Sequence, residues 1–562
     1  MNELTGAQKG RVAIRTFKTI ADSLILRGNY KPSGRTGQTL ERALREISPE
    51  IYGSMNDPRS VELSGLEYVL DRLPKGIENC NRIILTAQED LDHTTFEKIE
   101  PLKRRRISYK MNQHEICFVI TRGVSEVYDL LTHLTFLNIE SEKIYNRSHE
   151  EGNELSSVWK KLCEAVELDT EPAEKELDHL LWSTSILLGT TYQETRKIYE
   201  NIEKNKREFN SNNGFFKLIA GLGKRVKQSK QYDEDALTII FTPTFTDMVG
   251  HHVVSRNWAN QVKQKLYDLN YHKRPIHIIS ANMHSVKNTL YAYAAQGNKL
   301  KSKSETSNLY QFISETKDST DQITKIANQN GFTEIKDETG ANINYQIIDS
   351  HALSKVTFHP SLNLDFNPEN KDNPVILVMD YAFGAQAFEL MDELLKPELN
   401  QEKLFPQNIV SISIVGKAGI LPGEKGDIIL ATAHVIEGTA NNYIVNNNLG
   451  KDDFDGSIDV YEGPIVTVLG TSLQNKDVLE KFQTTSWKAV GLEMEGGHYQ
   501  RAISAAMIKN HISKDIKIRY AYYASDNPLK SGQTLASGSM GKEGIKPTYM
   551  ITKLVLEKII SE

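Results

Sequence analysis

The stretch Val375-Ile376-Leu377-Val378-Met379 leads, through Gly384, into a segment with helical spacing at residues 385–395. A short apolar run bounded by turn residues is typical of a strand buried on both faces. A strand followed closely by a helix is the repeating unit of α/β proteins with a largely parallel sheet. This stretch therefore predicts an α/β architecture for its part of the chain.

The same alternation continues on both sides of this stretch. Further strands are expected at residues 237–241, 275–279, 409–415, 427–432, 464–469 and 516–523, and further helices at 283–295, 495–507 and 548–560. A polar interval at about 297–340 has the composition of an insertion or surface excursion. We expect residues 233–562 to form one α/β domain, with its core motifs in 374–562.

Residues 1–232 have a different pattern of apolar residues and are expected to form a mainly helical domain. Val124, Val127, Leu131 and Leu134 share one face at helical spacing. The apolar runs 82–86 and 116–120 are short enough to be strands of a small mixed region. This domain could be a plain helical core or a platform for assembly or partners.

The composition is that of an ordinary globular protein. A chain of 562 residues with 39% hydrophobic and 25% charged residues suggests two to four domains with substantial cores. The net charge of −6 gives none of the basic character that nucleic-acid binding requires. The basic run at 103–106 is expected to be a solvated face.

The cysteines and the N-terminal residues indicate in which compartment the protein is expected. Cys80, Cys117 and Cys163 are an odd number with no close pair, which argues against a disulfide framework and a cysteine metal site. Residues 1–5 lack a signal-peptide pattern, and no run approaches the ~18 apolar residues of a membrane span. We expect a soluble, cytoplasmic protein without a metal or cofactor.

The first segment whose residues could bind a ligand is Val415-Gly416-Lys417-Ala418-Gly419. Gly416 and Gly419, expected in a turn after a strand, would let the backbone approach a ligand and turn its amides toward an anion. Lys417 would add a cation where a phosphate could lie. By itself, such a segment is more often a plain turn with a solvated lysine.

The second segment is Gly491-Leu492-Glu493-Met494-Glu495-Gly496-Gly497. A carboxylate of Glu493 or Glu495 could accept both hydrogens of a ribose diol, and Met494 would offer a soft apolar contact to the sugar. The alternative is a helix N-terminus at which the two acids interact favourably with the helix dipole.

The third segment, Ala524-Ser525-Asp526-Asn527-Pro528-Leu529, follows an apolar strand directly. Asp526, held by Ser525 and by an Asx-Pro turn, would be placed to exchange a proton with a ligand. Burial raises the pKa of a carboxyl group, which suits a general acid. A plain Asx turn is the alternative.

Together the segments resemble the nucleoside phosphorylase and nucleosidase superfamily, and within it AMP nucleosidase. The resemblance covers 374–562 and extends toward about 235. It is carried by five motifs in order: Val415-Gly416-Lys417-Ala418-Gly419, Gly426-Asp427-Ile428, Glu437-Gly438-Thr439, Glu493-Met494-Glu495 and Ser525-Asp526. Asp526 to Lys530 is also similar to the Ser-Asp-Lys-Pro-Leu stretch of AMP nucleosidases, which favours a purine nucleotide.

The resemblance implies a phosphorylase/hydrolase-like α/β domain with a central mixed sheet flanked by helices. It also implies residue roles. Asp526 would protonate the purine N7, with Ser525 orienting it. Glu495, with Met494 and Glu493, would hold the ribose hydroxyls. Gly416, Lys417 and Gly419 would form an anion subsite, and Gly384 matches the family's glycine after the preceding strand.

Departures from the family pattern leave alternatives open. Lys417 and Ala418 stand where phosphorylases carry a small polar group, and no arginine lies between Arg274 and Arg501 to clamp a phosphate. Hydrolysis of a purine nucleotide or nucleoside is therefore favoured over phosphorolysis with free phosphate.

Two further points concern catalysis and assembly. Asp247 and Asp380 are the candidates for a water-activating base. An inactive nucleotide-sensing protein is the alternative from another class. The family also implies a homo-oligomer.

Overall fold

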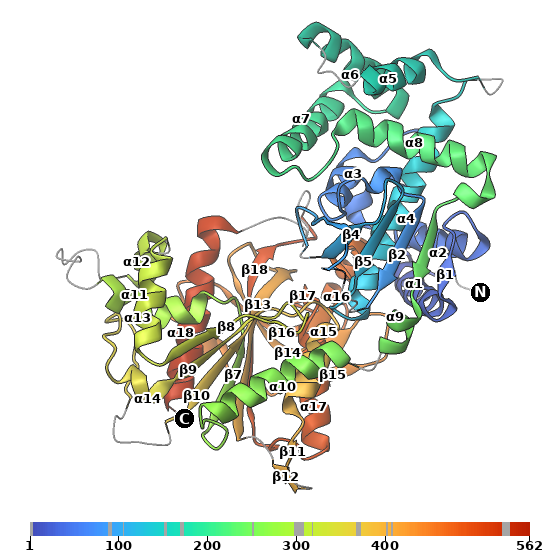
Figure 1. Cartoon of the computed structure of the whole chain (residues 1–562). Coiled ribbons are helices and arrows are strands. Elements are labelled where there is room, and N and C mark those ends of the chain that lie inside the picture. The colour runs from blue at the N-terminus through green and yellow to red at the C-terminus, as the bar shows by residue number, and fades with distance from the viewer. Residues whose placement is uncertain are drawn as a thin grey trace. The chain divides into compact units, whose positions relative to one another are not determined.

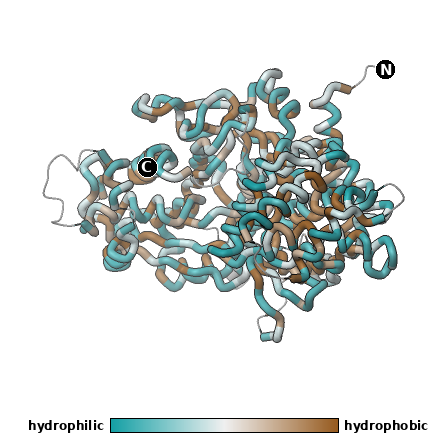
Figure 2. The backbone as a smooth tube through the Cα atoms, turned by 90° about the horizontal axis from the view of Figure 1, so that it is seen from above, coloured by the Kyte–Doolittle hydropathy of each residue, from teal (hydrophilic) through white to brown (hydrophobic). Residues whose placement is uncertain are grey.

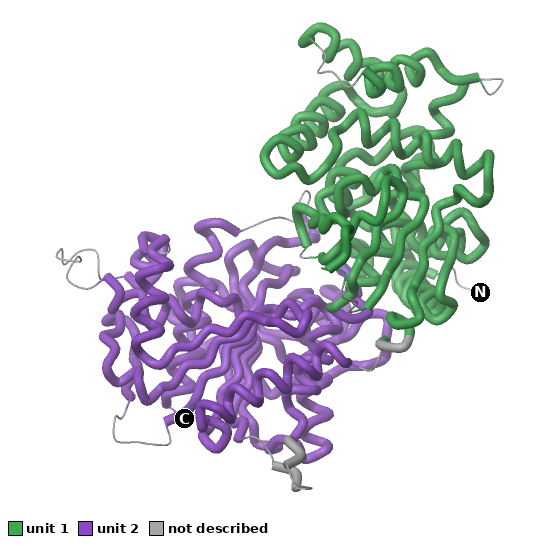
Figure 3. Tube along the Cα trace, in the orientation of Figure 1, with its two compact units in different colours: residues 1–121, 126–251, 472–478 green, residues 122–125, 252–471, 479–562 purple. Residues whose placement is uncertain are grey.

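The computed structural model describes residues 4–87, 91, 93–104, 106–150, 154–168, 173–249, 252–296, 308–316, 318–366, 373–400, 403–405, 408–530 and 540–561. The chain divides into two compact units (Figure 3). Unit 1 comprises Met1–Thr121, Glu126–His251 and Ser472–Val478, and unit 2 comprises Arg122–Ser125, His252–Thr471 and Leu479–Glu562.

Unit 1 combines helices with a sheet that is six-stranded among the described residues. The strand order is β1 (Asn29–Tyr30), β6 (Thr238–Phe241), β2 (Arg82–Thr86), β5 (Glu115–Val119), β4 (Ile107–Lys110) and β3 (Glu97–Lys98). The helices are α1 (Gly6–Arg27), α2 (Arg35–Ile47), α3 (Leu63–Leu70), α4 (Val124–Arg147), α5 (Ser157–Leu168), α6 (Glu174–Leu188), α7 (Tyr192–Phe209), α8 (Phe215–Gln231) and α9 (Pro243–Met248).

The structure places one predicted strand in a different unit from the expected one. Residues 237–241 do form a strand, β6, but β6 pairs with β1 and β2 inside unit 1. The compact units consequently part after 251 instead of after 232. Strand pairing is a long-range property, so the apolar run predicted the strand without predicting its sheet. The runs at 82–86 and 116–120 form β2 and β5.

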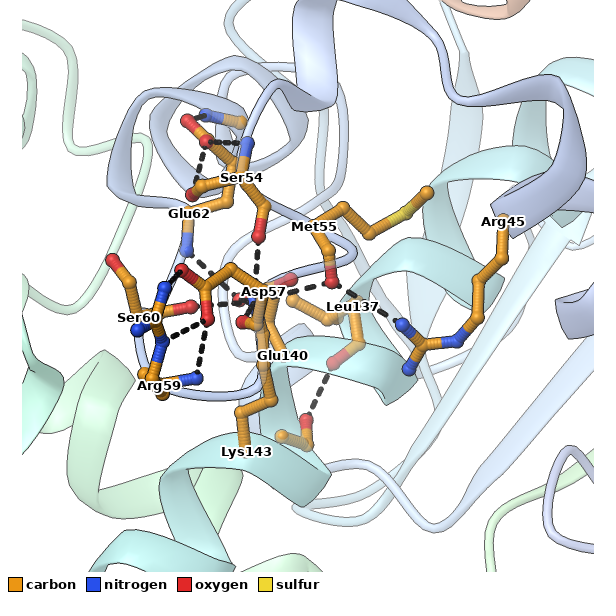
Figure 4. A network of polar contacts seen from close by, with 12 residues as sticks. Arg45, Ser54, Met55, Asp57, Arg59, Ser60, Glu62, Leu137, Glu140 and Lys143 are labelled. Carbon is orange, nitrogen blue, oxygen red and sulfur yellow. Dashed lines mark hydrogen bonds and ion pairs between the residues drawn. The ribbon is translucent and has the colours of Figure 1, made fainter.

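A buried lysine fixes a loop of unit 1 to α4 (Figure 4). Lys143 is 6% exposed, and its Nζ donates to the carbonyl oxygen of Ser60 at 2.7 Å and pairs with Glu140 at 2.9 Å. The carbonyl oxygens of Ser54, Met55 and Asp57 lie 3.3–3.4 Å from the same nitrogen. The ammonium group thus collects carbonyls that a buried loop would otherwise leave unsatisfied.

The sheet of unit 2 has ten strands in the part of the chain that is described. Its order is β15 (Asn442–Ile444), β14 (Ile428–Ile436), β16 (Val460–Thr467), β17 (Gly491–Glu493), β13 (Ile409–Ile420), β7 (Ile276–Ser280), β10 (Val375–Met379), β9 (Tyr345–Asp349) and β8 (Phe332–Ile335), with β18 (Lys517–Asp526) paired to β13 and β14. β7 is parallel to β10 and β13, and β17 is parallel to β16 but antiparallel to β13, whereas β9 and β15 run antiparallel to their neighbours. The expected central mixed sheet is therefore confirmed.

Helices cover both faces of this sheet (Figure 1). One group contains α11 (Ser285–Gln296), α12 (Leu309–Thr316), α13 (Thr320–Gln329) and α18 (Ile545–Ser561), and the other α10 (Val253–Asp268), α15 (Gln386–Leu395) and α17 (Gly496–Ile508). Shorter elements are α14 (Ser350–Leu353), α16 (Lys476–Thr484) and the hairpin β11 (Glu398–Asn400) and β12 (Lys403–Phe405).

The expected surface excursion at 297–340 proves to be part of the core where it is described. It contains α12, α13 and β8, and Phe312, Ile323 and Phe332 are buried against α11 and α18. Its few apolar residues fall on inward faces, which the polar average composition concealed. Residues 297–307 and 317 lie outside the described part.

Hydrophobic and hydrophilic segments alternate along the backbone (Figure 2). Within the described ranges, no helix combines the length and apolar character needed to cross a membrane.

Candidate active site

The carboxyl end of β13 brings two of the sequence motifs into the same part of the sheet. Gly419 pairs with Leu492 of β17 on one side and with Asp526 of β18 on the other. The Glu493-Met494-Glu495 segment and the Ser525-Asp526 segment therefore leave the sheet beside the same strand end, where α/β proteins place their chemistry.

The expected glycine turn at 415–419 is not present, because these residues lie inside β13. Gly416 pairs with Tyr522, and Gly419 follows a register shift after Ala418. A Cβ at Gly416 would lie 3.3 Å from the ring of Tyr522, so this glycine makes room for an aromatic side chain. The backbone here belongs to the sheet ladder and does not form an open anion-binding loop. Lys417 alone carries an exposed side chain in the motif.

The carboxylate of Glu493 is saturated by contacts within unit 2. It accepts hydrogen bonds from Thr467 Oγ1 at 2.5 Å and from the backbone N–H groups of Glu495 and Gly496, and His434 Nδ1 lies 3.5 Å away. Burial alone would raise the pKa of Glu493, but His434, Thr467 and the Gly496 amide together lower it. These contacts fix the start of α17.

Glu495 contacts another predicted site residue directly. The backbone N–H of Gly384 donates to Glu495 Oε1 at 2.9 Å. Gly384 has φ +54°, and a Cβ there would lie only 2.4 Å from Ser125 Oγ, which itself accepts from Ala385 N at 2.8 Å. The sulfur-bound methyl of Met494 lies 3.8 Å from the same Cβ position. The structure therefore gathers Gly384, Met494 and Glu495 at one point.

Asp526 ends β18 and is buried, with 1% of the residue exposed. Its Oδ1 contacts the hydroxyl of Ser525, which is also 3.1 Å from the Ala418 carbonyl oxygen. Its Oδ2 is buried and hydrogen-bonds to no described residue. Burial raises the pKa of Asp526, although Ser525, Lys417 and Lys425 act in the opposite direction.

The turn after Asp526 is held by Asn527. Its Nδ2 donates to the carbonyl oxygens of Leu421 at 3.0 Å and Gly423 at 2.9 Å, while its Oδ1 accepts from Leu529 N at 3.0 Å. The last contact is the expected Asx turn. The first two tie the turn to the segment that follows β13.

The sequence did not reveal that Tyr522 belongs to the candidate site or which residues it contacts. Its ring covers Gly416, and a Cβ on Gly496 would lie 2.2 Å from its hydroxyl. His434 packs edge-on against Tyr520 at 4.7 Å and against Tyr522 at 6.4 Å. The signal was the strand alternation that places 520 and 522 on one face. Nothing local showed that this face meets His434.

The proposed water-activating acids remain unassigned. Asp247 lies on α9 of unit 1. Asp380 follows β10, and its Oδ1 accepts from Tyr381 N at 2.8 Å.

One trio of potential metal ligands occurs among the described residues. His252, Asp392 and Glu393 place ligand atoms within 4.8 Å of one another. However, Lys396 Nζ lies 3.2 Å from Asp392 and 2.7 Å from Glu393, and Lys509 lies 3.8 Å from Asp392. The carboxylates are thus engaged in ion pairs, and we assign no metal to them.

Comparison of the sequence with protein families gives one matching family. The model of a "family of unknown function (DUF6909)" matches residues 38–301 and 301–561. A search of curated proteins gave no match.

Solved structures with similarity to about half of the chain include nucleoside-cleaving enzymes. A 5'-methylthioadenosine/S-adenosyl homocysteine nucleosidase from Campylobacter jejuni is 13% identical, with 51% of this chain and 100% of that chain covered and a TM-score of 0.31. A futalosine hydrolase from Helicobacter pylori is 12% identical, with 51% and 100% covered and a TM-score of 0.30. A uridine phosphorylase from Schistosoma mansoni is 12% identical, with 51% and 86% covered and a TM-score of 0.30. At this level of similarity, the function has to be argued from the residues of this chain.

Proposed function

The chain belongs to this family of unknown function, DUF6909, and we propose that its unit 2 cleaves the N-glycosidic bond of a purine nucleotide or nucleoside and releases the free base. The proposal depends above all on Asp526. A buried carboxyl group at the end of a parallel strand, with a raised pKa and one oxygen without a hydrogen bond to any described residue, is suited to donating a proton.

The contacts of Ser525 orient the carboxyl group of Asp526. The Ser525 hydroxyl lies 3.1 Å from the Ala418 carbonyl oxygen and also contacts Asp526 Oδ1, so it ties the carboxyl group to the end of β13. Ser525 would thus be the orienting residue that the family resemblance implied.

Proton transfer makes the base a better leaving group. Asp526 would donate its proton to N7 of the purine while the bond between C1′ and the base breaks and its electron pair stays with the base. The sugar becomes an oxocarbenium-like cation. Water then adds at C1′ and releases one proton to solvent, or, in phosphorolysis, an anionic phosphate oxygen adds there.

The sugar would be held by Glu495. Its carboxylate accepts the N–H of Gly384 and would accept the ribose hydroxyls through charge-assisted hydrogen bonds. Met494 lies beside Gly384 and would supply the apolar contact. We assign Glu493 a positioning role, because its oxygens are engaged by Thr467 and by the start of α17.

Hydrolysis remains the favoured chemistry. The glycines of β13 form no open phosphate loop, and no arginine lies between Arg274 and Arg501. The same observations are compatible with a nucleotide sensor that has lost catalysis. The homo-oligomer stays a prediction that light scattering can check.

Base release tests the proposal directly. We expect the purified full chain to liberate free base from at least one purine nucleotide or nucleoside, as followed by chromatography with and without phosphate. A requirement for phosphate would identify phosphorolysis. Tight nucleotide binding without any base release would favour the sensor, and neither binding nor release would refute both.

A further inference from the structure

Four helices of unit 1 surround a cavity of about 640 Å³. Helix α5 packs against α6 and α8, and α7 packs against the same two helices (Figure 1). Residues from all four helices line the cavity. A cavity between packed helices is a common place for a small-molecule site, and this volume is within the usual range. Its lining residues lie within 161–217, outside the motifs of the candidate active site.

Each of the four helices contributes apolar side chains to the wall of this cavity. They include Leu168 of α5, Leu177 and Leu180 of α6, Tyr199 of α7 and Phe216 of α8. The ring centroids of Tyr199 and Phe216 are 5.4 Å apart. Leu168 is 72% exposed, and the other four residues are half-buried. Apolar side chains that face a cavity from several elements indicate a site for the apolar part of a ligand.

Positive charge exceeds negative charge around this apolar wall. The basic lining residues are Lys161, Lys206, Arg207 and Lys217, and the acids among the described lining residues are Glu176 and Glu203. Four cations against two acids leave a surplus of two positive charges, with His179 not counted. The cavity therefore combines an apolar wall with a cationic border.

The carboxylate of Glu203 is already engaged within unit 1. Its Oε1 accepts a hydrogen bond from the backbone N–H of Phe215 at 2.9 Å, and its Oε2 accepts one from Lys206 Nζ at 3.2 Å. Gly214, at φ +98°, makes room for this carboxylate, because a Cβ there would lie 2.6 Å from Glu203 Oε1. Glu203 thus holds the start of α8 and balances the charge of Lys206. The other three lining cations outnumber Glu176.

We propose that this cavity of unit 1 binds a carboxylate attached to an apolar hydrocarbon body, as in a medium-chain fatty acid. The guanidinium fork of Arg207 matches the two oxygens of a carboxylate, and such pairs form strong charge-assisted hydrogen bonds. The hydrocarbon body would leave water by packing against the apolar wall. The assignment gives the helical unit a ligand-binding role, and it does not depend on the chemistry proposed for unit 2.

Decanoate is the probe for this site, titrated into the full chain by calorimetry below its micelle-forming concentration. We expect saturable binding. Acetate carries the same charge without the hydrocarbon chain, and decyltrimethylammonium carries a chain of the same length with the opposite charge. Each should bind at least about tenfold more weakly than decanoate, because the cavity offers partners to both parts of the ligand.

Two substitutions test the two parts of the site separately. Arg207→Met should weaken decanoate binding by roughly tenfold or more, because it removes a charge-assisted hydrogen bond. Leu168→Asp places a negative charge in the apolar wall and should weaken binding at least as much. Both side chains are exposed, so the fold should tolerate their replacement. Lys204→Met is the matched control, because Lys204 is exposed on the same helix as Arg207 and outside the lining of the cavity.

The absence of saturable decanoate binding would overturn the proposal. Equal affinities for decanoate and decyltrimethylammonium would also overturn it, since the cations would then play no part. The same holds if Arg207→Met and Leu168→Asp bind decanoate as tightly as Lys204→Met. Thermal unfolding of each variant checks its folding. Binding is measured without turnover, so a failure of this site and a failure of base release by unit 2 are separate results.

Discussion

At the scale of single residues, the carboxyl group of Asp526 shows how burial and local charge compete. Burial raises its pKa, and the hydroxyl of Ser525 and the charges of Lys417 and Lys425 reduce that effect without cancelling it. A general acid is useful when it is still protonated near the working pH.

Activity is expected to fall as pH rises through the raised pKa of Asp526, because only the protonated form can donate. Asp526→Asn should reduce base release by about 10²–10⁴-fold while ligand binding persists. A pH–rate profile with Asp526→Glu, which restores an acid at altered reach, is the accompanying control. Full activity in Asp526→Asn would contradict the assignment.

Gly384 offers a second test at this scale. With φ at +54° and a Cβ position 2.4 Å from Ser125 Oγ, an alanine is both strained and obstructed. We expect Gly384→Ala to destabilise the chain by about 1–3 kcal/mol and to raise KM through the displaced partner of Glu495. Chemical denaturation and kinetics measure the two effects. Gly456→Ala, at another positive φ but with open space around it, controls for backbone strain.

At the scale of elements, the start of α17 separates two acids that the sequence presents as equivalents. The Glu493 carboxylate accepts hydrogen bonds from Thr467 and from the first backbone amides of α17. The Glu495 carboxylate instead accepts one from the backbone of Gly384, in the loop after β10. Their different surroundings predict different consequences of the same substitution.

Glu493→Gln should cost about 1–3 kcal/mol of stability, because a buried acceptor of several bonds is altered beside His434. Glu495→Gln should leave stability nearly unchanged and raise KM or lower kcat for a ribose-containing substrate. Urea denaturation and steady-state kinetics on both variants distinguish them. Equal effects of the two substitutions would be incompatible with the assigned roles.

At the scale of the whole molecule, each unit has its own buried hydrophobic residues, and unit 1 also has a buried polar anchor. In unit 1 the anchor is Lys143, which holds the loop at 54–60 against α4. None of these partners of Lys143 belongs to the candidate site. A substitution of Lys143 should therefore lower the stability of the protein without changing its base-release activity.

Lys143→Met is expected to destabilise the protein by about 3–5 kcal/mol, because it leaves Glu140 buried without its partner. Base release by the protein that remains folded should be unaffected. Calorimetry and the activity assay give the two readouts. Lys224→Met removes an exposed pair with Glu167 and should shift stability by under about 1 kcal/mol. A Lys143→Met protein as stable as the wild type would refute the anchor.

The sequence by itself determined several elements of unit 2 and its candidate acids. The run 375–379 forms β10 as predicted, and the runs 275–279 and 516–523 form β7 and β18. Asp526 was identified from its place at a strand end, and its burial follows from the apolar strand before it. These features are local: apolar periodicity and turn residues are written in neighbouring positions.

Only the tertiary structure decided which elements meet. It placed strand 237–241 in unit 1, turned the glycines at 416 and 419 into strand residues, and gave Glu493 and Glu495 different partners. It also gathered apolar residues of α5, α6, α7 and α8 around one cavity. Strand pairing and cavity lining join residues far apart in the chain, and local propensity carries no information about such contacts.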